Sequence, residues 1–299
     1  GRAAKSSFYV NDPHARFHGK TLDELIAWGD PEANQFDNLP IDRSTYTRLR
    51  QRVTEHLGEA GDLYVTDAWS GRTNISRLGV RVITSRSASA LFARNIFLRA
   101  SEEELTAFRP DWTILHAPDV DAEEGDGTNG SAFIITDLSG RTTIIGGTAY
   151  HGQIKKSIFA VQNFRLPLKG ILTMHAGASE GTEGLSAIHA GLSGTGKTTL
   201  SNTGHPVADD QIVIEIDSQD RDAVISNMEG GQYAKTENLL REKEPETYDA
   251  IKWGTTAENI AHDADGRPDY ADGSITANGR VGYPLDYVPT AKISGTTKA

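Results

Sequence analysis

The chain has 299 residues, enough for one large or two ordinary domains, and its formal net charge of −11 argues against a general nucleic-acid-binding protein. It contains no Cys, which excludes disulfides and thiolate chemistry. No run approaches the roughly 18 apolar residues of a transmembrane helix, and the first residues lack the apolar segment of a signal peptide. We therefore expect a cytoplasmic protein, and we interpret the missing initial Met as the sign of a processed or partial chain.

The first half of the chain predicts helices alternating with short strands. Thr21 and Glu24 form a capping-box pattern, and residues 44–58 carry apolar residues at helical spacing. Ser101 opens a second capping box. We expect the acidic stretch 119–130 to be a solvated loop and not a metal site, because it lacks the spacing of a calcium-binding loop. The remaining elements are a buried helix at 89–98 and strands at 62–69, 78–85, 111–118, 131–138 and 141–150.

The second half is richer in strands. We expect a domain boundary near residues 166–170, which gives an N-terminal domain of residues 1–168 and a second domain of residues 169–299. The last residues, 289–299, contain no apolar run that could finish a sheet, so we expect the second domain to be incomplete. Strands are predicted at 171–177, 185–191, 211–217 and 222–228, and a hairpin at 271–285.

Residues 191–198, "GLSGTGKT", match the pattern of a phosphate-binding loop. Glycines let successive backbone N–H groups point at phosphate oxygens without obstruction by a Cβ atom. Lys197 supplies a positive charge to the phosphates, and Thr198 supplies a hydroxyl for the metal that bridges them. The alternative is a glycine-rich turn that matches by chance. The strand-like run directly before the loop argues against that alternative.

Asp209 and Asp210 follow Lys197 by only 12 and 13 residues. In an ordinary P-loop enzyme, the metal-binding acid follows a longer helix and at least one more strand. Two adjacent acids before a strand are in general a solvated turn. After a phosphate loop, we interpret them instead as candidate metal ligands.

Several polar residues upstream have two interpretations. If residues 146–159 are extended, Tyr150 and Lys156 share one face and Lys155 lies on the other. Taken alone, the two lysines are surface charges, His175 is a hydrogen-bonded structural residue, and Arg2 is a surface arginine.

Together these segments resemble the ATP-dependent phosphoenolpyruvate carboxykinases. The matching phrases occur in the family's order and cover nearly the whole chain; they include "GGTAYHGQIKKSIF", "LPLKGILTMHAGAS", "GLSGTGKTTL", "NMEGGQYAKT" and "GRVGYP". The GTP-using relatives carry a different, Cys-containing loop, so the resemblance points to ATP. It implies decarboxylation and phosphorylation of oxaloacetate to phosphoenolpyruvate, CO2 and ADP, a reaction of gluconeogenesis, with Mg2+ at the nucleotide and Mn2+ at a second site.

The resemblance also implies a fold and a set of site residues. The fold is α/β with two domains, the second being a mixed-sheet P-loop domain. The implied Mn2+ ligands are Lys156, His175 and Asp210, and Lys156 can serve only as a neutral amine. Arg2 and Tyr150 would bind the substrate with Lys156, and catalysis would involve Lys155, Lys156 and Arg280. The implied nucleotide contacts are Leu192, Ser193, Gly194, Thr195, Gly196, Lys197, Thr198, Thr199, Glu244 and Arg280, with Thr198 also on Mg2+.

The chain departs from the family's wording beside several of these residues. Gln153, Gln211 and Ile212 replace two acids and a histidine of the usual motifs, which leaves open an altered activity. The family also extends beyond both ends of this chain, so the resemblance implies a fragment. The alternatives are a divergent P-loop kinase of another acceptor and a non-catalytic nucleotide-binding relative. We expect small-molecule partners, no nucleic acid or membrane, and a monomer.

Overall fold

The computed structural model describes residues 6–9, 16–17, 20–21 and 39–298, except 129, 182, 192–199, 201–203, 217–221, 277 and 293. Its contacts divide the chain into two compact units, between which the chain passes several times. Unit 1 comprises Gly1–Asp67, Gly79–Ala90 and Ala107–Val161; unit 2 comprises Ala68–Leu78, Leu91–Thr106 and Gln162–Ala299. The last passage lies close to the domain boundary expected at residues 168–169, which stays a prediction. None of the described helices is long and apolar enough to cross a membrane.

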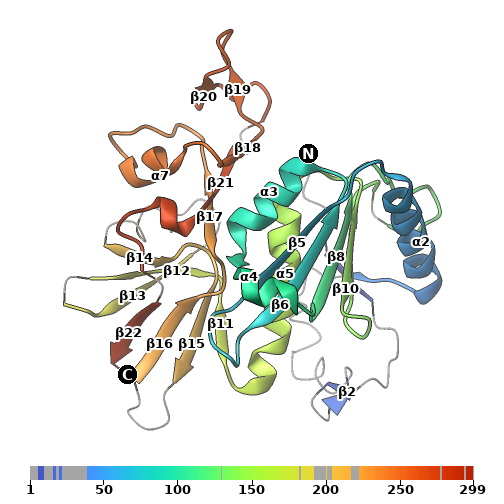
Figure 1. Cartoon of the computed structure of the whole chain (residues 1–299), viewed down its shortest axis with the longest axis horizontal. Helices are drawn as coiled ribbons and strands as arrows, with labels where there is room; N and C mark the ends of the chain where they lie inside the picture. Colours follow the sequence, from blue (N-terminus) through green and yellow to red (C-terminus); the bar gives the residue numbers. More distant parts are fainter. Residues whose placement is uncertain are drawn as a thin grey trace. The chain divides into compact units, whose positions relative to one another are not determined.

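A mixed sheet dominates unit 1, as the α/β prediction requires (Figure 1). Strands β1, β6, β8 and β10 take part in parallel pairs, whereas β9 and β10 pair antiparallel. The sheet order is β4 (Leu39–Pro40), β1 (Ser6–Tyr9), β9 (Phe133–Asp137), β10 (Thr142–Gly146), β8 (Trp112–Ala117), β6 (Leu78–Thr84) and β5 (Tyr64–Ser70). The end of β5, which belongs to unit 2, pairs with β7 (Leu98–Arg99).

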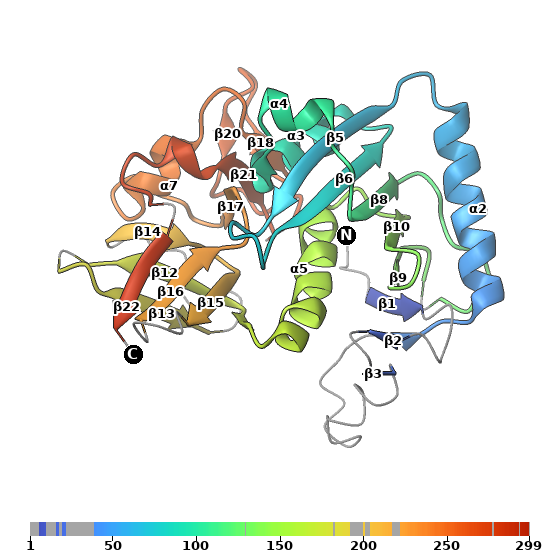
Figure 2. The ribbon, with the colours of Figure 1, turned by 60° about the horizontal axis from the view of Figure 1, so that its bottom comes forward.

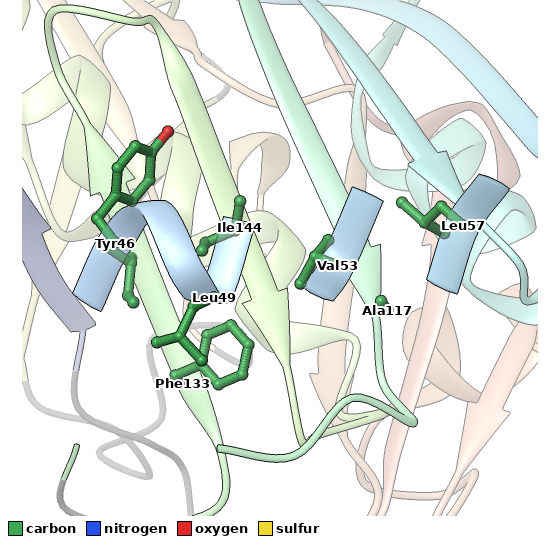
Figure 3. Packing of buried hydrophobic residues seen from close by; sticks show 8 residues of the cluster. Tyr46, Leu49, Val53, Leu57, Ala117, Phe133 and Ile144 are labelled. Atoms are coloured by element: carbon green, nitrogen blue, oxygen red, sulfur yellow. The ribbon is translucent and has the colours of Figure 1, made fainter. Parts of the chain in front are cut away.

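Helix α2 (Arg43–Glu59) confirms the helix predicted from apolar spacing. Asp42 caps it by accepting a 2.9 Å hydrogen bond from the Thr45 backbone N–H. Four residues at helical spacing, Tyr46, Leu49, Val53 and Leu57, face the sheet and are buried. They pack against Ala117, Phe133, Ile135 and Ile144 of the strands (Figure 3). Full burial of each large apolar side chain is worth roughly 1.5–3 kcal/mol.

Two predictions in the first half of the chain need correction. The acidic loop 119–130 is not wholly solvated, because Asp126 is buried and accepts hydrogen bonds from Arg48 and Arg52 of α2. Residues 146–159 are not extended. The chain turns at Gly147, whose φ is +64° and where a Cβ atom would overlap the carbonyl of Ser131, and helix α5 (Gly152–Arg165) follows.

Two further predicted helices of this half are confirmed. Helix α3 (Ser87–Ile96) matches the buried helix. Before α4 (Glu102–Thr106), the Ser101 backbone N–H donates to the Glu104 carboxylate and the Glu104 N–H donates to the Ser101 hydroxyl, which is a complete capping box. Thr21 lies in β3 (Lys20–Thr21), which pairs with β2 (Arg16–Phe17). The rest of the helix predicted there lies outside the described residues.

Unit 2 contains two antiparallel sheets that share a core (Figure 2). The first has the order β11 (Leu172–Met174), β15 (Ile212–Ile216), β16 (Asp222–Asn227) and β22 (Ser294–Lys298). The second has the order β13 (Ser186–Ala190), β12 (Ala176–Glu180) and β14 (His205–Ala208). The prediction that residues 289–299 contribute nothing to a sheet was wrong, because β22 pairs with β16 through backbone hydrogen bonds that need no apolar side chains.

A third sheet of unit 2 consists of β17 (Gly231–Lys235), β21 (Arg280–Pro284) and β18 (Thr256–Glu258). The predicted hairpin at 271–285 was wrong, because β21 pairs with β17 and β18 and not with the segment directly before it. The smaller elements nearby are η1 (Pro167–Lys169), α7 (Pro245–Ala250), β19 (Ala261–His262), β20 (Pro268–Asp269) and η2 (Leu285–Tyr287).

Candidate functional site

The chain crosses twice between the two core-sharing sheets of unit 2, at neighbouring points. It leaves β11 at His175 to enter β12, and it returns from β14 through residues 209–211 to β15. Met174 pairs with Ile212 in one sheet, and Ala178 pairs with Ala208 in the other. Because both registers are fixed, the two crossings must lie opposite each other.

The two crossings bring His175 and Asp210 into contact. The His175 Nε2 and Asp210 Oδ1 atoms lie 2.6 Å apart. The His175 side chain is 43% exposed and that of Asp210 is 17% exposed. An imidazole nitrogen and a carboxylate oxygen therefore converge at a point that solvent ions can reach.

The neighbours of Asp210 point into the protein. Asp209 is buried, and Gln211 is buried and donates from Nε2 to Asn163 Oδ1 at 3.2 Å. Ile212 is fully buried in the core between the two sheets. Position 212 therefore belongs to the core and position 211 to a buried amide pair, which accounts for an apolar residue and an uncharged residue there.

The charges of Asp209 and Glu244 both act on a buried tyrosine, Tyr283. Burial raises the pKa of the Tyr283 hydroxyl, and the carboxylates of Asp209 and Glu244 raise it further. The hydroxyl stays protonated and donates to Gln232 Oε1 at 2.7 Å. Glu244 itself is the residue before helix α7.

Arg280 is the first residue of strand β21, the strand that also contains Tyr283. Its Nε donates to Asn278 Oδ1 at 3.0 Å, and its guanidinium carbon lies 5.5 Å from the centre of the Tyr233 ring. The Arg280 side chain is partly exposed.

Tyr150, Lys155 and Lys156 lie at the start of helix α5, in unit 1. The Tyr150 ring lies directly over the backbone of Gly152, where a Cβ atom would overlap it. Lys155 is buried, whereas Lys156 is partly exposed with its Nζ 4.3 Å from the centre of the Phe159 ring. Because consecutive helix residues point about 100° apart, the two lysines have different surroundings but not opposite faces.

Comparison with known proteins decides the family. The family model described as phosphoenolpyruvate carboxykinase matches residues 1–299. The chain belongs to the phosphoenolpyruvate carboxykinase family. It is 41% identical over 293 residues to a phosphoenolpyruvate carboxykinase (ATP) of Geobacter sp. (strain M21), which covers 97% of this chain and 52% of that protein.

Other relatives give the same result. Proteins named phosphoenolpyruvate carboxykinase (ATP) from Bacillus cytotoxicus and from Staphylococcus aureus (strain Newman) are each 39% identical, over 290 and 292 residues. Each alignment covers 96% of this chain and 52% of the relative. The chain therefore spans about half the length of these phosphoenolpyruvate carboxykinases.

The His175–Asp210 pair fits the Mn2+ that this carboxykinase family implies. Nitrogen from imidazole and oxygen from carboxylate are ligands that Mn2+ accepts. Among the described residues, no cluster of three or more His, Asp or Glu side chains forms a larger metal site. Lys156, the third implied ligand, belongs to unit 1, whereas His175 and Asp210 belong to unit 2.

Part of the implied carboxykinase site lies outside the described residues. This part comprises Arg2 and the phosphate loop, Leu192, Ser193, Gly194, Thr195, Gly196, Lys197, Thr198 and Thr199. The strand predicted before that loop is present as β13. No role for Tyr283 was predicted, although "GRVGYP" was part of the resemblance. An aromatic residue directly after a glycine on a strand carries no local sign that the carboxylates of Asp209 and Glu244 act on it.

Proposed function

We propose that this protein catalyses ATP-dependent conversion of oxaloacetate to phosphoenolpyruvate, CO2 and ADP. The contact between His175 and Asp210 carries the proposal, because it joins two implied metal ligands across 35 residues of chain that include the phosphate loop. The names of relatives that are about 40% identical to this chain over the aligned half of their length support it.

Each implied residue takes a chemical role under this proposal. Arg2 and Tyr150 bind the substrate, with Arg2 on a carboxylate. The bond to the departing carboxylate breaks, CO2 leaves, and the electron pair stays behind as an enolate. The enolate oxygen then takes the γ-phosphoryl group of ATP, and ADP leaves. Lys155 and Arg280 steady the transferring phosphoryl group as fixed positive charges.

The metals and the nucleotide complete the proposed site. Lys156 as a neutral amine, His175 and Asp210 would hold Mn2+, which supplies positive charge beside the developing enolate. Thr198 would hold Mg2+ through its hydroxyl, and the backbone of residues 192–199 would bind the phosphates of ATP. Glu244 and Arg280 would contact the nucleotide.

The proposal also covers the division into domains, the cellular location and the oligomeric state. Residues 1–168 would form the substrate-binding domain and residues 169–299 the first part of the P-loop domain. The protein would act as a cytoplasmic monomer on small molecules, without nucleic acid or membrane.

The test is formation of phosphoenolpyruvate from oxaloacetate, ATP and Mn2+ by the natural gene product that contains this chain. Activity that is lost in Asp210→Asn and kept in Asp263→Asn, an exposed control, supports the proposal. ATP binding without phosphoenolpyruvate formation would overturn it. Transfer of phosphate to another acceptor would instead identify a divergent kinase.

A further inference from the structure

A basic cavity in unit 2 is lined by none of the described residues of the proposed active site. It has a volume of about 570 Å3, which is within the range of small-molecule sites. Its lining includes Arg72, Arg77, Arg99 and Lys292 but a single acid, Asp286. Such a surplus of positive charge is unexpected in a chain whose net charge is −11.

Backbone contacts fix the wall of this cavity. The Gly230 N–H donates to the Ile96 carbonyl at 2.8 Å, and the Leu285 N–H donates to the Gly230 carbonyl at 2.9 Å. Gly71 has a φ of +83° and donates its N–H to the Met228 carbonyl at 2.9 Å. A Cβ atom at Gly71 would overlap the Ser76 carbonyl, so glycine is required beside Arg72. The arginine is therefore held on a rigid turn.

Two of the four cations are already neutralised. Arg77 pairs with Glu104 and lies 3.8 Å from the centre of the Trp69 ring. Lys292 pairs with Glu180. The charge of each of these two side chains is therefore balanced within the protein.

Arg72 and Arg99 differ from them. Within the part of the chain that the structure describes, neither has an ion-pair partner. The Nε of Arg72 is buried without a hydrogen-bond partner among those residues. Burial lowers the pKa of Arg72, because the charged guanidinium group loses hydration. Buried N–H groups are normally hydrogen-bonded. We therefore expect a bound ligand to supply the acceptor that Arg72 Nε lacks among the described residues.

We propose that this cavity binds a small organic dianion through Arg72 and Arg99. A phosphate monoester or a dicarboxylate matches these two guanidinium groups, which have no ion-pair partner among the described residues. Each planar guanidinium can donate two parallel hydrogen bonds to a pair of phosphate or carboxylate oxygens. The apolar part of the ligand packs against Trp69, Phe97 and Leu285 of the lining. The inference does not rest on the proposed catalytic activity, because none of the described catalytic, metal or nucleotide residues lines the cavity.

Phenyl phosphate is the probe, and phenol is its uncharged match. Isothermal titration of the protein should show saturable binding of phenyl phosphate and at least tenfold weaker binding of phenol. Arg72→Gln should weaken phenyl phosphate binding at least tenfold, and Arg99→Gln at least threefold. Arg94→Gln, an exposed arginine outside the lining, should change it less than twofold.

Two further measurements keep the test decisive. Circular dichroism melts establish that each variant is folded; Arg99 is exposed, so its replacement tests the cavity even if Arg72→Gln unfolds. Succinate in place of phenyl phosphate separates a dicarboxylate ligand from a phosphate ligand. Equal binding of phenol and phenyl phosphate, or folded Arg72→Gln and Arg99→Gln variants that bind as the parent does, would overturn the proposal.

Discussion

The imidazole Nε2 of His175 lies 2.6 Å from the Oδ1 of Asp210, although 35 residues separate the two in the chain. Two strand registers impose this contact, because β11 pairs with β15 and β12 pairs with β14. The backbone pairing of the two sheets therefore places the side chains of His175 and Asp210 next to each other.

The first prediction concerns Mn2+ binding. His175→Asn and Asp210→Asn should each weaken Mn2+ binding by about tenfold or more, because each removes one donor of the pair. Electron paramagnetic resonance of free Mn2+ in a titration measures the affinity. His262→Asn, at an exposed position of unit 2, is the matched control and should bind as the parent does. Unchanged affinity in both site variants would show that the pair does not hold the metal.

The second prediction concerns Lys156. Lys156→Arg should lower phosphoenolpyruvate formation by about a hundredfold or more, since guanidinium stays protonated and cannot donate an electron pair to a metal. Lys252→Arg is a good control, because Lys252 also has its Nζ over an aromatic ring, 4.2 Å from the centre of Tyr287. The assay compares initial rates at saturating ATP. If Lys156→Arg keeps more than a tenth of the parent rate, Lys156 is not a ligand.

The third prediction concerns pH. Burial lowers the pKa of His116 from 6.5 to about 4, and its Nδ1 and Nε2 contact Thr84 Oγ1 and the Thr148 carbonyl. The unfolded chain therefore binds a proton that the folded chain excludes. This contribution to stability is complete above about pH 6.5 and is lost as pH falls towards 4.

The loss between pH 7.5 and pH 5 should be about 2 kcal/mol. Urea unfolding of the parent and of His116→Gln at both pH values isolates this residue, because the other titrating groups cancel in the difference. The parent should lose about 2 kcal/mol more than the variant over this range. Equal losses would mean that His116 titrates normally in the folded protein.

The fourth prediction concerns close backbone packing in unit 2. A Cβ atom at Gly231 would overlap the carbonyl oxygen of Asn95, which cannot move without shifting its chain. Gly231→Ala should destabilise the protein by about 1–3 kcal/mol. Gly273→Ala, where no atom lies within 4 Å of the added carbon, should have little effect. Denaturant midpoints compare the two, and similar midpoints would contradict the packing argument.

Local patterns predicted most of the elements. Helix α2 and the capping box before α4 were visible in the sequence, because both depend on residues within a turn or two of each other. The predicted faces of Tyr150, Lys155 and Lys156 depended on an extended segment 146–159, whereas a helix begins at Gly152. Gly152 in fact lies under the Tyr150 ring at the first turn of a helix.

Features that depend on residues far apart in the chain could not be predicted from the sequence. Asp126 is buried because Arg48 and Arg52 reach it from α2, more than 70 residues earlier. Strand β22 has no apolar pattern and is defined by its partner β16. The metal-binding role of His175 and Asp210 was implied by the family resemblance and stays a prediction. The basic cavity combines segments from residues 69 to 292 and had no local signature in the sequence.

The two neighbouring crossings have a consequence for how this architecture can change. Residues 176–208, with the phosphate loop inside them, leave and rejoin the β11–β15 sheet at almost the same point. Because the two ends of this segment meet, a change in the length of its loops need not move β11 or β15, whereas β12 and β14 are bound to those strands by the shared core. Residues 192–199, which are predicted to bind phosphate, therefore belong to a segment whose two ends are joined by the contact between His175 and Asp210.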